Sequence, residues 1–284
     1  MIVSEEQPHS SSPVIRIQPF DSWTVEGLKE VWEYRELLYF LIWRDVKVRY
    51  KQTAIGAAWA VIQPLMTMVA FTLVFSRLAG MPSEGLPYPI FSYAALLPWT
   101  YFSKALNQSI TSVVGNAHLI TKVYFPRLLL PFSAAVGGLI DFALGFVILL
   151  GMLGWYRIVP GFWGTLMLPF FLLLTVLTAI SVSLWLSVIN VRYRDVGQAV
   201  PFLINLWLFA SPVAYPTGIV SEKWRLLLGL NPMTGVIEGF RWALLGNDMP
   251  DVGPLVVSTL VVLVLFFTGL LFFKRMESTF ADLV

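Results

Sequence analysis

Four basic residues lie close together ahead of the first apolar stretch of the chain: Arg44, Lys47, Arg49 and Lys51. Arginine and lysine hold phosphate through charge-assisted hydrogen bonds, and a basic cluster beside a membrane attracts anionic headgroups. We therefore expect these side chains to form an entrance for a phosphate-bearing lipid headgroup. A simple membrane-surface anchor is the alternative that these residues leave open.

Catalytic and metal-binding patterns are missing from the sequence. There is no cysteine, which excludes disulfides, thiolate metal sites and cysteine nucleophiles. His9 and His118 are too isolated to share a metal, and no carboxylate pair or Ser-His-Asp set falls in one plausible pocket. The glycine-rich phosphate loop of ATPases is also missing, so we expect no catalytic residue, no metal and no cofactor in this chain.

Six apolar stretches occupy most of the sequence, at 54–78, 88–113, 128–156, 163–189, 198–215 and 252–273. Each approaches or exceeds the roughly 20 residues that a helix needs to cross a bilayer. Only 13% of the residues are charged, against about a quarter in soluble domains. We predict an all-α polytopic membrane protein with six transmembrane helices, and the net charge of +2 gives no indication of nucleic-acid binding.

Lysine and arginine are divided unequally between the two sets of gaps. One set holds Arg44, Lys47, Arg49, Lys51, Lys122, Arg127, Arg192, Arg194, Lys274 and Arg275, and the other holds Arg77, Arg157, Lys223, Arg225 and Arg241. Short cytoplasmic loops carry the excess of positive charge, so both termini are expected in the cytoplasm. No cleavable signal peptide is recognised, and the first span would act as the insertion signal.

The chain ahead of the first span divides into two parts. Residues 1–20 are polar and expected to be disordered, and residues 21–52 are expected to form an amphipathic interface helix capped by Asp21 or Ser22. Its apolar residues recur at helical spacing: Trp32, Tyr39, Trp43, Val46 and Tyr50. Residues 53–284 would then form the transmembrane domain.

Two gaps between the spans predict short helices. Asn116 can cap a helix of about two turns that Pro126 ends, and its apolar residues would be exposed for docking to a partner or would dip into lipid. Further on, 222–228 forms one short helix and 231–246 another, with Asn231 as N-cap, Pro232 at the first position and Gly246 at the end. About 14 residues are too few to cross, so these are expected to be external re-entrant helices, a gate or structural filler.

Several motifs together resemble a known family. These are VRYKQTAIGAAWAVIQP at 48–64, KVYFPR at 122–127, YRDVG at 193–197, ASPVAYP at 210–216, Asn-Pro-Met at 231–233 and Glu-Gly-Phe-Arg at 238–241. In order and separation they resemble the ABC-2 type permeases that export polysaccharides, nearest to the O-antigen, capsule and teichoic acid exporters.

The resemblance implies a half-transporter in the bacterial inner membrane. Two copies would pair around a channel, two copies of a separate ATPase would bind ATP and Mg²⁺, and the substrate would be a lipid-linked polysaccharide. The helix between spans two and three would couple to the ATPase through Asn116, His118, Leu119, Ile120, Lys122, Tyr124 and Phe125. The external gate would include Asn231, Pro232, Glu238 and Arg241.

The aromatic content of 15% suits a channel for sugars, whose C–H faces stack on aromatic rings. The expected lining residues are Trp59, Gln63, Phe71, Phe75, Tyr93, Trp99, Asn205, Trp207 and Tyr215. Interfacial or lipid-facing positions are the competing interpretation for these aromatics. Asp141, deep in the third stretch, is expected to pair with Lys104 or to line the channel.

Other function classes remain open at this point. An ABC-2 exporter of drugs or lipids would share the architecture, although a less aromatic channel is expected there. A membrane-embedded transferase acting on lipid-linked sugars would need catalytic acids in its loops, and Glu222, Glu238, Asp248 and Asp251 make a weak set. A purely structural membrane subunit would not need an apolar coupling loop.

Overall fold

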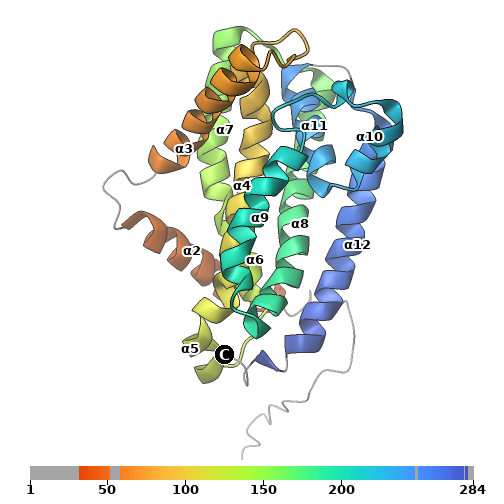
Figure 1. Ribbon diagram of the computed structural model, residues 1–284. Helices are drawn as coiled ribbons and strands as arrows, with labels where there is room; N and C mark the ends of the chain where they lie inside the picture. The colour runs from red at the N-terminus through yellow and green to blue at the C-terminus, as the bar shows by residue number, and fades with distance from the viewer. Residues whose placement is uncertain (1–31, 52–57, 247–248, 278, 281–284) are drawn as a thin grey trace, which may run out of the picture.

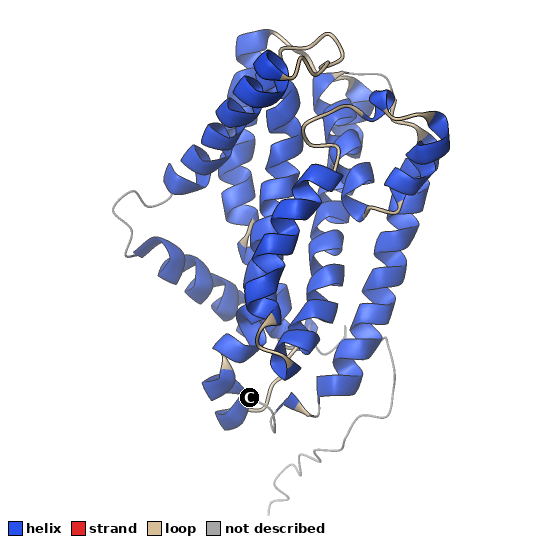
Figure 2. Cartoon of the chain, in the orientation of Figure 1, coloured by secondary structure: helices blue, strands red, loops and turns tan. Residues whose placement is uncertain are grey.

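The computed structural model describes residues 32–51, 58–246, 249–277 and 279–280. All regular secondary structure in these residues is helical, and the long helices lie side by side along one axis (Figures 1 and 2). In chain order the elements are α2 (Arg35–Lys51), α3 (Ala58–Phe71), the π-helix η1 (Thr72–Leu78), α4 (Tyr88–Gly115), α5 (Ala117–Lys122), α6 (Leu129–Gly137), α7 (Leu139–Tyr156), α8 (Phe162–Arg192), α9 (Val196–Ala210), the 3-10 helix η2 (Thr217–Ile219), α10 (Glu222–Gly229), α11 (Pro232–Leu245) and α12 (Val252–Glu277).

The predicted apolar stretches coincide with these helices, with three differences in extent. The third stretch is divided at Gly138 into α6 and α7, and the sixth continues past residue 273 to Glu277. The fifth was expected to reach residue 215, but α9 ends at Ala210. The prediction was wrong there because Pro212 lacks a backbone donor and disfavours the helical conformation of Ser211 before it, which is extended.

Four helical segments of the described residues are long and apolar enough to cross a membrane: Ala58–Leu78, Leu129–Tyr156, Phe162–Arg192 and Val252–Glu277. Of the other two expected spans, α9 is apolar but has only 15 residues. The 28-residue α4 is long enough, but it carries polar side chains and contacts α3, α6, α7, α8, α9 and α11. It is therefore the central helix of the bundle (Figure 1).

Hydrogen bonds from side chains tie α4 to its neighbours. The Tyr93 hydroxyl donates to the Gly145 carbonyl of α7 over 3.1 Å, and the Tyr101 hydroxyl donates to the Ala135 carbonyl of α6 over 3.0 Å. Each satisfies a polar group that would otherwise be costly in an apolar interior.

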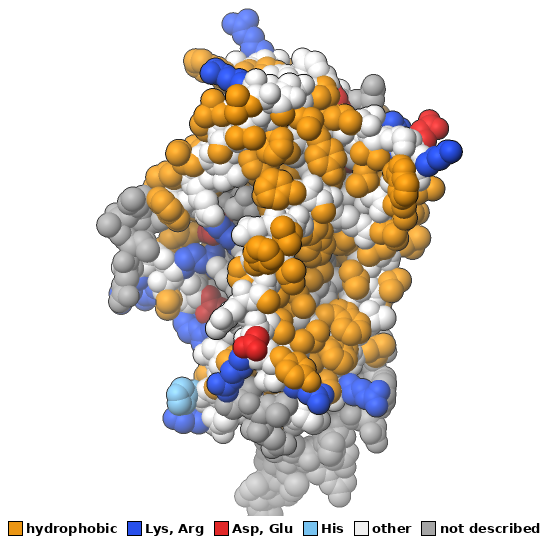
Figure 3. Space-filling model, viewed as in Figure 1, with side chains coloured by type: hydrophobic (Ala, Val, Ile, Leu, Met, Phe, Trp, Pro, Cys, Tyr) orange, Lys and Arg blue, Asp and Glu red, His pale blue; other side chains and the backbone are white. Residues whose placement is uncertain are grey.

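The two ends of the bundle carry different short elements. We call the end that holds α5 and the last turn of α12 the α5 end, and the opposite end, with α10 and α11, the α11 end (Figure 1). At the α5 end the Arg127 backbone N–H donates to Glu277 Oε1 over 2.7 Å, which fastens the segment after α5 to α12. Apolar side chains cover most of the face between the ends, while lysine and arginine stand near both ends and in a further group at mid-height on the left of the view (Figure 3).

The predicted interface helix is described from residue 32 onward, so its expected cap, Asp21 or Ser22, and the segment 1–20 lie outside the described residues. Helix α2 packs on α6, where Val46 Cγ2 lies 3.9 Å from the position that a Cβ on Gly137 would take. Tyr39 and Trp43 point away from the bundle, with 63% and 55% of their surface exposed. The predicted apolar face is thus divided between a side that touches the protein and an aromatic side available to lipid.

Candidate functional site

A cluster of charged and polar side chains joins the end of α2 to the bundle. Arg49 Nη1 lies 3.2 Å from Asp141 Oδ2 on α7, and Arg49 Nη2 donates to Gln108 Oε1 on α4 over 2.6 Å. Lys104 Nζ lies 3.7 Å from the same carboxylate oxygen, and the Tyr50 hydroxyl donates to Asp141 Oδ1. The expected pairing of Asp141 with Lys104 is confirmed, but Arg49 is the closer ionic partner.

The remaining basic residues of the predicted headgroup entrance stand on the outside of α2. Arg44 pairs with the neighbouring Asp45 over 2.8 Å, while Lys47 and Lys51 are exposed. Three of the four cations therefore project from the surface, and Arg49 turns inward to Asp141. Binding of a headgroup by these residues stays a prediction.

Helix α5 is the predicted coupling helix, and it is shorter than the loop that contains it. It begins at Ala117 and ends at Lys122, ahead of an extended Val123, so Pro126 lies beyond the end instead of terminating it. Asn116 occupies the N-cap position, but its side chain donates to the Ser112 carbonyl of α4 and makes no capping hydrogen bond. The predicted side-chain cap was wrong because the preceding helix offers the closer partner.

The exposure predicted for this loop is only partly correct. Ile120 and Phe125 were expected to be exposed, but they are 7% and 6% exposed and belong to the hydrophobic core. Leu119 is half-buried, whereas Tyr124 remains 67% exposed. Two apolar side chains thus anchor the loop, and the rest form a surface that we call the α5 surface: His118, Lys122, Val123 and Tyr124.

At the opposite end, α11 has the caps that the sequence predicts. Asn231 Oδ1 accepts a hydrogen bond from the Met233 N–H over 3.1 Å, Pro232 is the first helical residue, and Gly246 follows the helix at φ +72°. The same Asn231 oxygen accepts from Trp207 Nε1 of α9 over 2.9 Å. Asn231 therefore caps α11 and also holds it against α9. Helix α10 likewise agrees with its predicted range.

Helix α11 is embedded in the bundle instead of lying over its mouth. Twelve of its 14 residues are buried, and it packs against α4, α8 and α12. A Cβ on Gly239 would overlap the Phe171 ring of α8, and one on Gly235 would overlap Ser258 of α12. Glycine at these two positions permits a close approach that any other residue would prevent. The prediction of a helix too short to cross is confirmed by its 14 residues, and its re-entrant position in the membrane stays a prediction.

Arg241 is the centre of a buried polar network on α11. Its guanidinium, 2% exposed, lies 3.2 Å from Glu238 Oε1 and donates to the Val213 carbonyl over 2.8 Å and to the Tyr215 carbonyl over 3.2 Å. Its Cζ also sits 3.7 Å from the centroid of the Phe91 ring. Burial raises the pKa of Glu238, and the charge of Arg241 opposes that rise. The network fastens the segment after α9 to α11.

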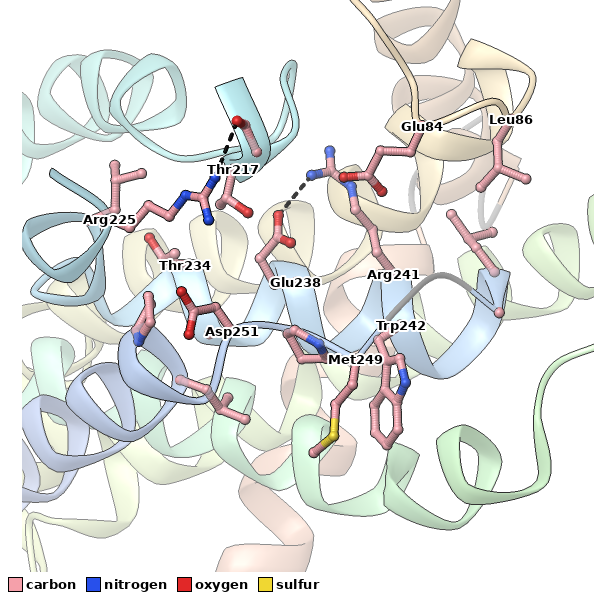
Figure 4. A pocket seen from close by; sticks show the side chains of 18 residues that line it. Glu84, Leu86, Thr217, Arg225, Thr234, Glu238, Arg241, Trp242, Met249 and Asp251 are labelled. Atoms are coloured by element: carbon pink, nitrogen blue, oxygen red, sulfur yellow. Dashed lines mark hydrogen bonds and ion pairs between the residues drawn. The ribbon is translucent and has the colours of Figure 1, made fainter. Parts of the chain in front are cut away.

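A pocket of about 720 Å³ opens beside this network (Figure 4). Glu84 and Glu238 lie on either side of the Arg241 guanidinium, and Glu84 is held at φ +55°, a backbone conformation that few residues other than glycine adopt. The sequence reasoning missed Glu84 and Thr234 as part of this site. The Ser-Glu-Gly turn at 83–85 was the one local signal, since glycine after an acidic residue indicates a tight turn.

The predicted channel-lining residues separate into two groups. Phe71, Tyr93 and Trp99 are buried within the chain, with at most 8% of their surface exposed, so they are core residues in this structure. Tyr93 and Trp99 were mispredicted because α4 is central and aromatic rings fill its contacts, as in the packing of Trp99 against Trp207, whereas Phe71 ends α3 and packs against Phe75. The others are exposed or half-buried, and lining stays a prediction for them: Trp59, Gln63, Phe75, Asn205, Trp207 and Tyr215.

The fold defines a multi-pass membrane protein. Its apolar helices span the distance between two polar ends, and the described residues contain no cluster of side chains suited to a metal ion. The family model described as ABC-2 type transporter matches residues 36–245, so the chain belongs to that family of membrane transport proteins.

Individual relatives make the class more specific. The chain is 30% identical over 258 residues to the O-antigen export system permease protein RfbA of Myxococcus xanthus, covering 90% of this chain and 98% of that protein. A protein of the same name from Klebsiella pneumoniae is 25% identical over 252 residues, 88% of this chain and 95% of its own length. The polysialic acid transport protein KpsM of Escherichia coli is 22% identical over 240 residues, 84% of this chain and 92% of its own.

Proposed function

We propose that this chain is the membrane-spanning subunit of an ATP-driven exporter that moves a lipid-linked polysaccharide of the O-antigen kind across the bacterial inner membrane. The observation that carries the proposal is the match, over nearly their full length, to permeases named for O-antigen and polysialic acid export. The chain is a transport subunit and not an enzyme on this proposal.

The α5 end would face the cytoplasm, with both termini, and would receive the ATPase. In the proposed assembly two copies of this chain pair around the channel, and two copies of a separate ATPase bind ATP and Mg²⁺ and contact the α5 surface. The exposed Tyr124 next to the buried Phe125 supports this, because a side chain held in place by a buried neighbour can transmit a push to the bundle. The sequence has no phosphate loop of its own, which supports a separate source of energy.

The substrate path follows from the charges and the exposed aromatics. Arg44, Lys47 and Lys51 would attract the phosphate of the lipid carrier at the membrane surface. The glycan would then move along exposed residues of α3 and α9, among them Trp59 and Asn205, toward the α11 end. Because Arg49 joins α2 to the bundle through Asp141, a displacement of α2 would be transmitted to α4 and α7.

The test measures ATP hydrolysis by the full chain in nanodiscs, alone and co-purified with its ATPase subunit, with and without a lipid-linked oligosaccharide. We expect hydrolysis only in the complex and a further increase with the glycan lipid. The matched control is the same complex with the phosphate-loop lysine of the ATPase replaced. A complex stimulated equally by the lipid carrier without sugar would indicate a lipid exporter, and a chain that binds no ATPase would overturn the proposal.

A further inference from the structure

The polar cluster between α2, α4 and α7 holds two cations but one carboxylate. Arg49 and Lys104 both lie beside Asp141 Oδ2, at 3.2 Å and 3.7 Å. Among the described residues no other carboxylate forms an ion pair with either cation. Because the closer Arg49 already matches the charge of Asp141, Lys104 carries an excess positive charge at a partly buried position, which is costly. An anion is the partner that would balance it.

The hydrogen-bond donors of α4 in this cluster are uncommitted. Lys104 Nζ is too far from Asp141 for a hydrogen bond and makes none with any described residue. Gln108, one turn further along α4 and on the same face, accepts from Arg49 through Oε1, but its amide nitrogen donates to no described residue. The two terminal nitrogens of Arg49, in contrast, already donate to Asp141 and Gln108. An additional ligand would therefore find its donors on Lys104 and Gln108.

These donors can be reached from outside the protein. The Lys104 side chain keeps 23% of its surface exposed, and that of Arg49 keeps 20%. The described residues contain two buried side-chain atoms without a hydrogen-bond partner, and both lie at the α11 end, on Thr234 and Arg241. Lys104 Nζ and Gln108 Nε2 also have no partner and are not among these buried atoms, so they are open to solvent.

A lipid can approach the cluster beside α2. Tyr39 and Trp43 stand on the side of α2 that is available to lipid, and exposed aromatic residues of this kind concentrate in the headgroup layer. Arg49 follows them on the same helix. Figure 3 shows basic and acidic side chains together at mid-height on the left of the view, the side on which α2 leaves the bundle in Figure 1. The cluster thus lies next to a helix of the membrane surface.

A phosphate group meets these conditions. It brings the missing negative charge, and its oxygens accept hydrogen bonds from an ammonium and an amide at once. We infer that Lys104 and Gln108 bind the phosphate of a lipid headgroup beside Arg49. Asp141 holds Arg49 in place, and the exposed cations of α2 attract the lipid to the site. That this lipid carries an exported glycan rests on the proposed function.

The test measures binding to the full chain in a non-ionic detergent by isothermal titration calorimetry, with the signal of the detergent alone subtracted. The probes are farnesyl phosphate, farnesol, which has the same chain without the phosphate, and inorganic phosphate, which has no chain. We expect farnesyl phosphate to bind at micromolar concentration and the other two at least about tenfold more weakly. Equal binding of farnesol would overturn the phosphate site, and equal binding of inorganic phosphate would overturn its assignment to a lipid.

Two substitutions remove the excess charge in different ways. Lys104→Gln removes the cation and leaves the pair of Arg49 with Asp141 intact, whereas Gln108→Glu adds a carboxylate in a side chain of the same shape. Both should weaken farnesyl phosphate binding about tenfold. Neither should lower the melting temperature, because neither leaves a buried charge without a partner. A lysine that served only to stabilise Asp141 would give the opposite result, unchanged binding with a lower melting temperature.

Two further variants serve as controls. Lys104→Arg keeps the charge and should retain binding, and Lys223→Gln, which removes an exposed lysine of α10, should also retain it. Binding that is unaffected by either Lys104→Gln or Gln108→Glu, or that is lost equally in Lys223→Gln, would overturn the inference.

A parallel export assay, in cells that lack the chain and are complemented with it, separates this inference from the proposed function. Restored polysaccharide export by a chain that binds no farnesyl phosphate would overturn the phosphate site alone. Lys104-dependent binding in a chain that restores no export would support the phosphate site and refute the exporter.

Discussion

Short helices at the two ends of the bundle are held in different ways. At the α11 end, α11 has 12 of its 14 residues buried and is enclosed by α4, α8 and α12. At the α5 end, Ile120 is the one buried residue among the six of α5, and Phe125 adds a second anchor just beyond it. Helix α11 is part of the core, whereas α5 is attached to the core by Ile120 and Phe125.

The difference means that α11 is fixed in the core, whereas α5 is available for contact with a partner. Helix α11 cannot shift without breaking the hydrogen bonds of Arg241 to the Val213 and Tyr215 carbonyls and disturbing two glycine contacts, so its movement would require a change in the whole bundle. Helix α5 presents most of its surface to whatever lies beyond the protein, which suits a contact that forms and breaks with a partner.

The largest effect is expected from Arg241→Met at the α11 end. Removing the guanidinium leaves Glu238 buried without its cation and frees two backbone carbonyls, so we expect a loss of about 3–5 kcal/mol in stability. Thermal unfolding of the purified chain in detergent measures it. The double variant Arg241→Met with Glu238→Leu should recover the part of the loss that comes from the unpaired carboxylate, and Arg77→Ala, an exposed arginine at the same end, is the control.

An intact Arg241→Met protein as stable as the unaltered chain would show that the network is not what holds α11. The comparison between the two ends would then rest on packing alone.

A smaller effect is expected from Asp141→Asn, because its cluster is less completely buried. Arg49 and Lys104 keep 20% and 23% of their side-chain surface exposed, so water can partly solvate them when the carboxylate charge is lost. We expect a loss of about 2 kcal/mol and a looser α2, measured by thermal unfolding and by protease cleavage within α2. Asp195→Asn, an exposed residue with no capping bond, should have no effect.

The sequence predicts features that depend on neighbouring residues, but not contacts between residues that are far apart in the chain. The caps of α11 are local: Asn231, Pro232 and Gly246 each act on backbone groups within a turn, so they can be recognised without a fold. The burial of Ile120 and Phe125 depends on helices that no local pattern identifies. The same is true of Arg49 and Asp141, which meet although 92 positions separate them.

The aromatic residues of α4 show the same limit. Helical periodicity indicates which residues share a face, but it does not tell which of several apolar helices lies at the centre. Tyr93 and Trp99 were assigned to a channel because their chemistry suits one, and the structure encloses them because α4 has neighbours on every side.

The two N-cap asparagines allow the comparison to be tested with one substitution at each end. Asn231→Ala removes hydrogen bonds to Met233, Trp207 and Ser211, and we expect it to lower stability by about 1–2 kcal/mol. Asn116→Ala removes a single bond to its own preceding helix, and we expect a loss of about 0.5 kcal/mol. Thermal unfolding of both variants under the same conditions gives the difference, and equal losses would contradict it.

Tyr124→Ala is expected to have the smallest effect on stability. It is also expected to have the largest effect on coupling to the ATPase. Tyr124 is 67% exposed, so its removal should change stability by less than about 0.5 kcal/mol. If the α5 surface receives the ATPase, the variant should co-purify less ATPase and lose stimulation of ATP hydrolysis. Trp224→Ala, which removes a comparably exposed aromatic residue from α10 at the α11 end, should retain both. Equal losses from the two substitutions would mean that exposed aromatic residues contact lipid at both ends. The α5 surface would then not be the specific contact for the ATPase.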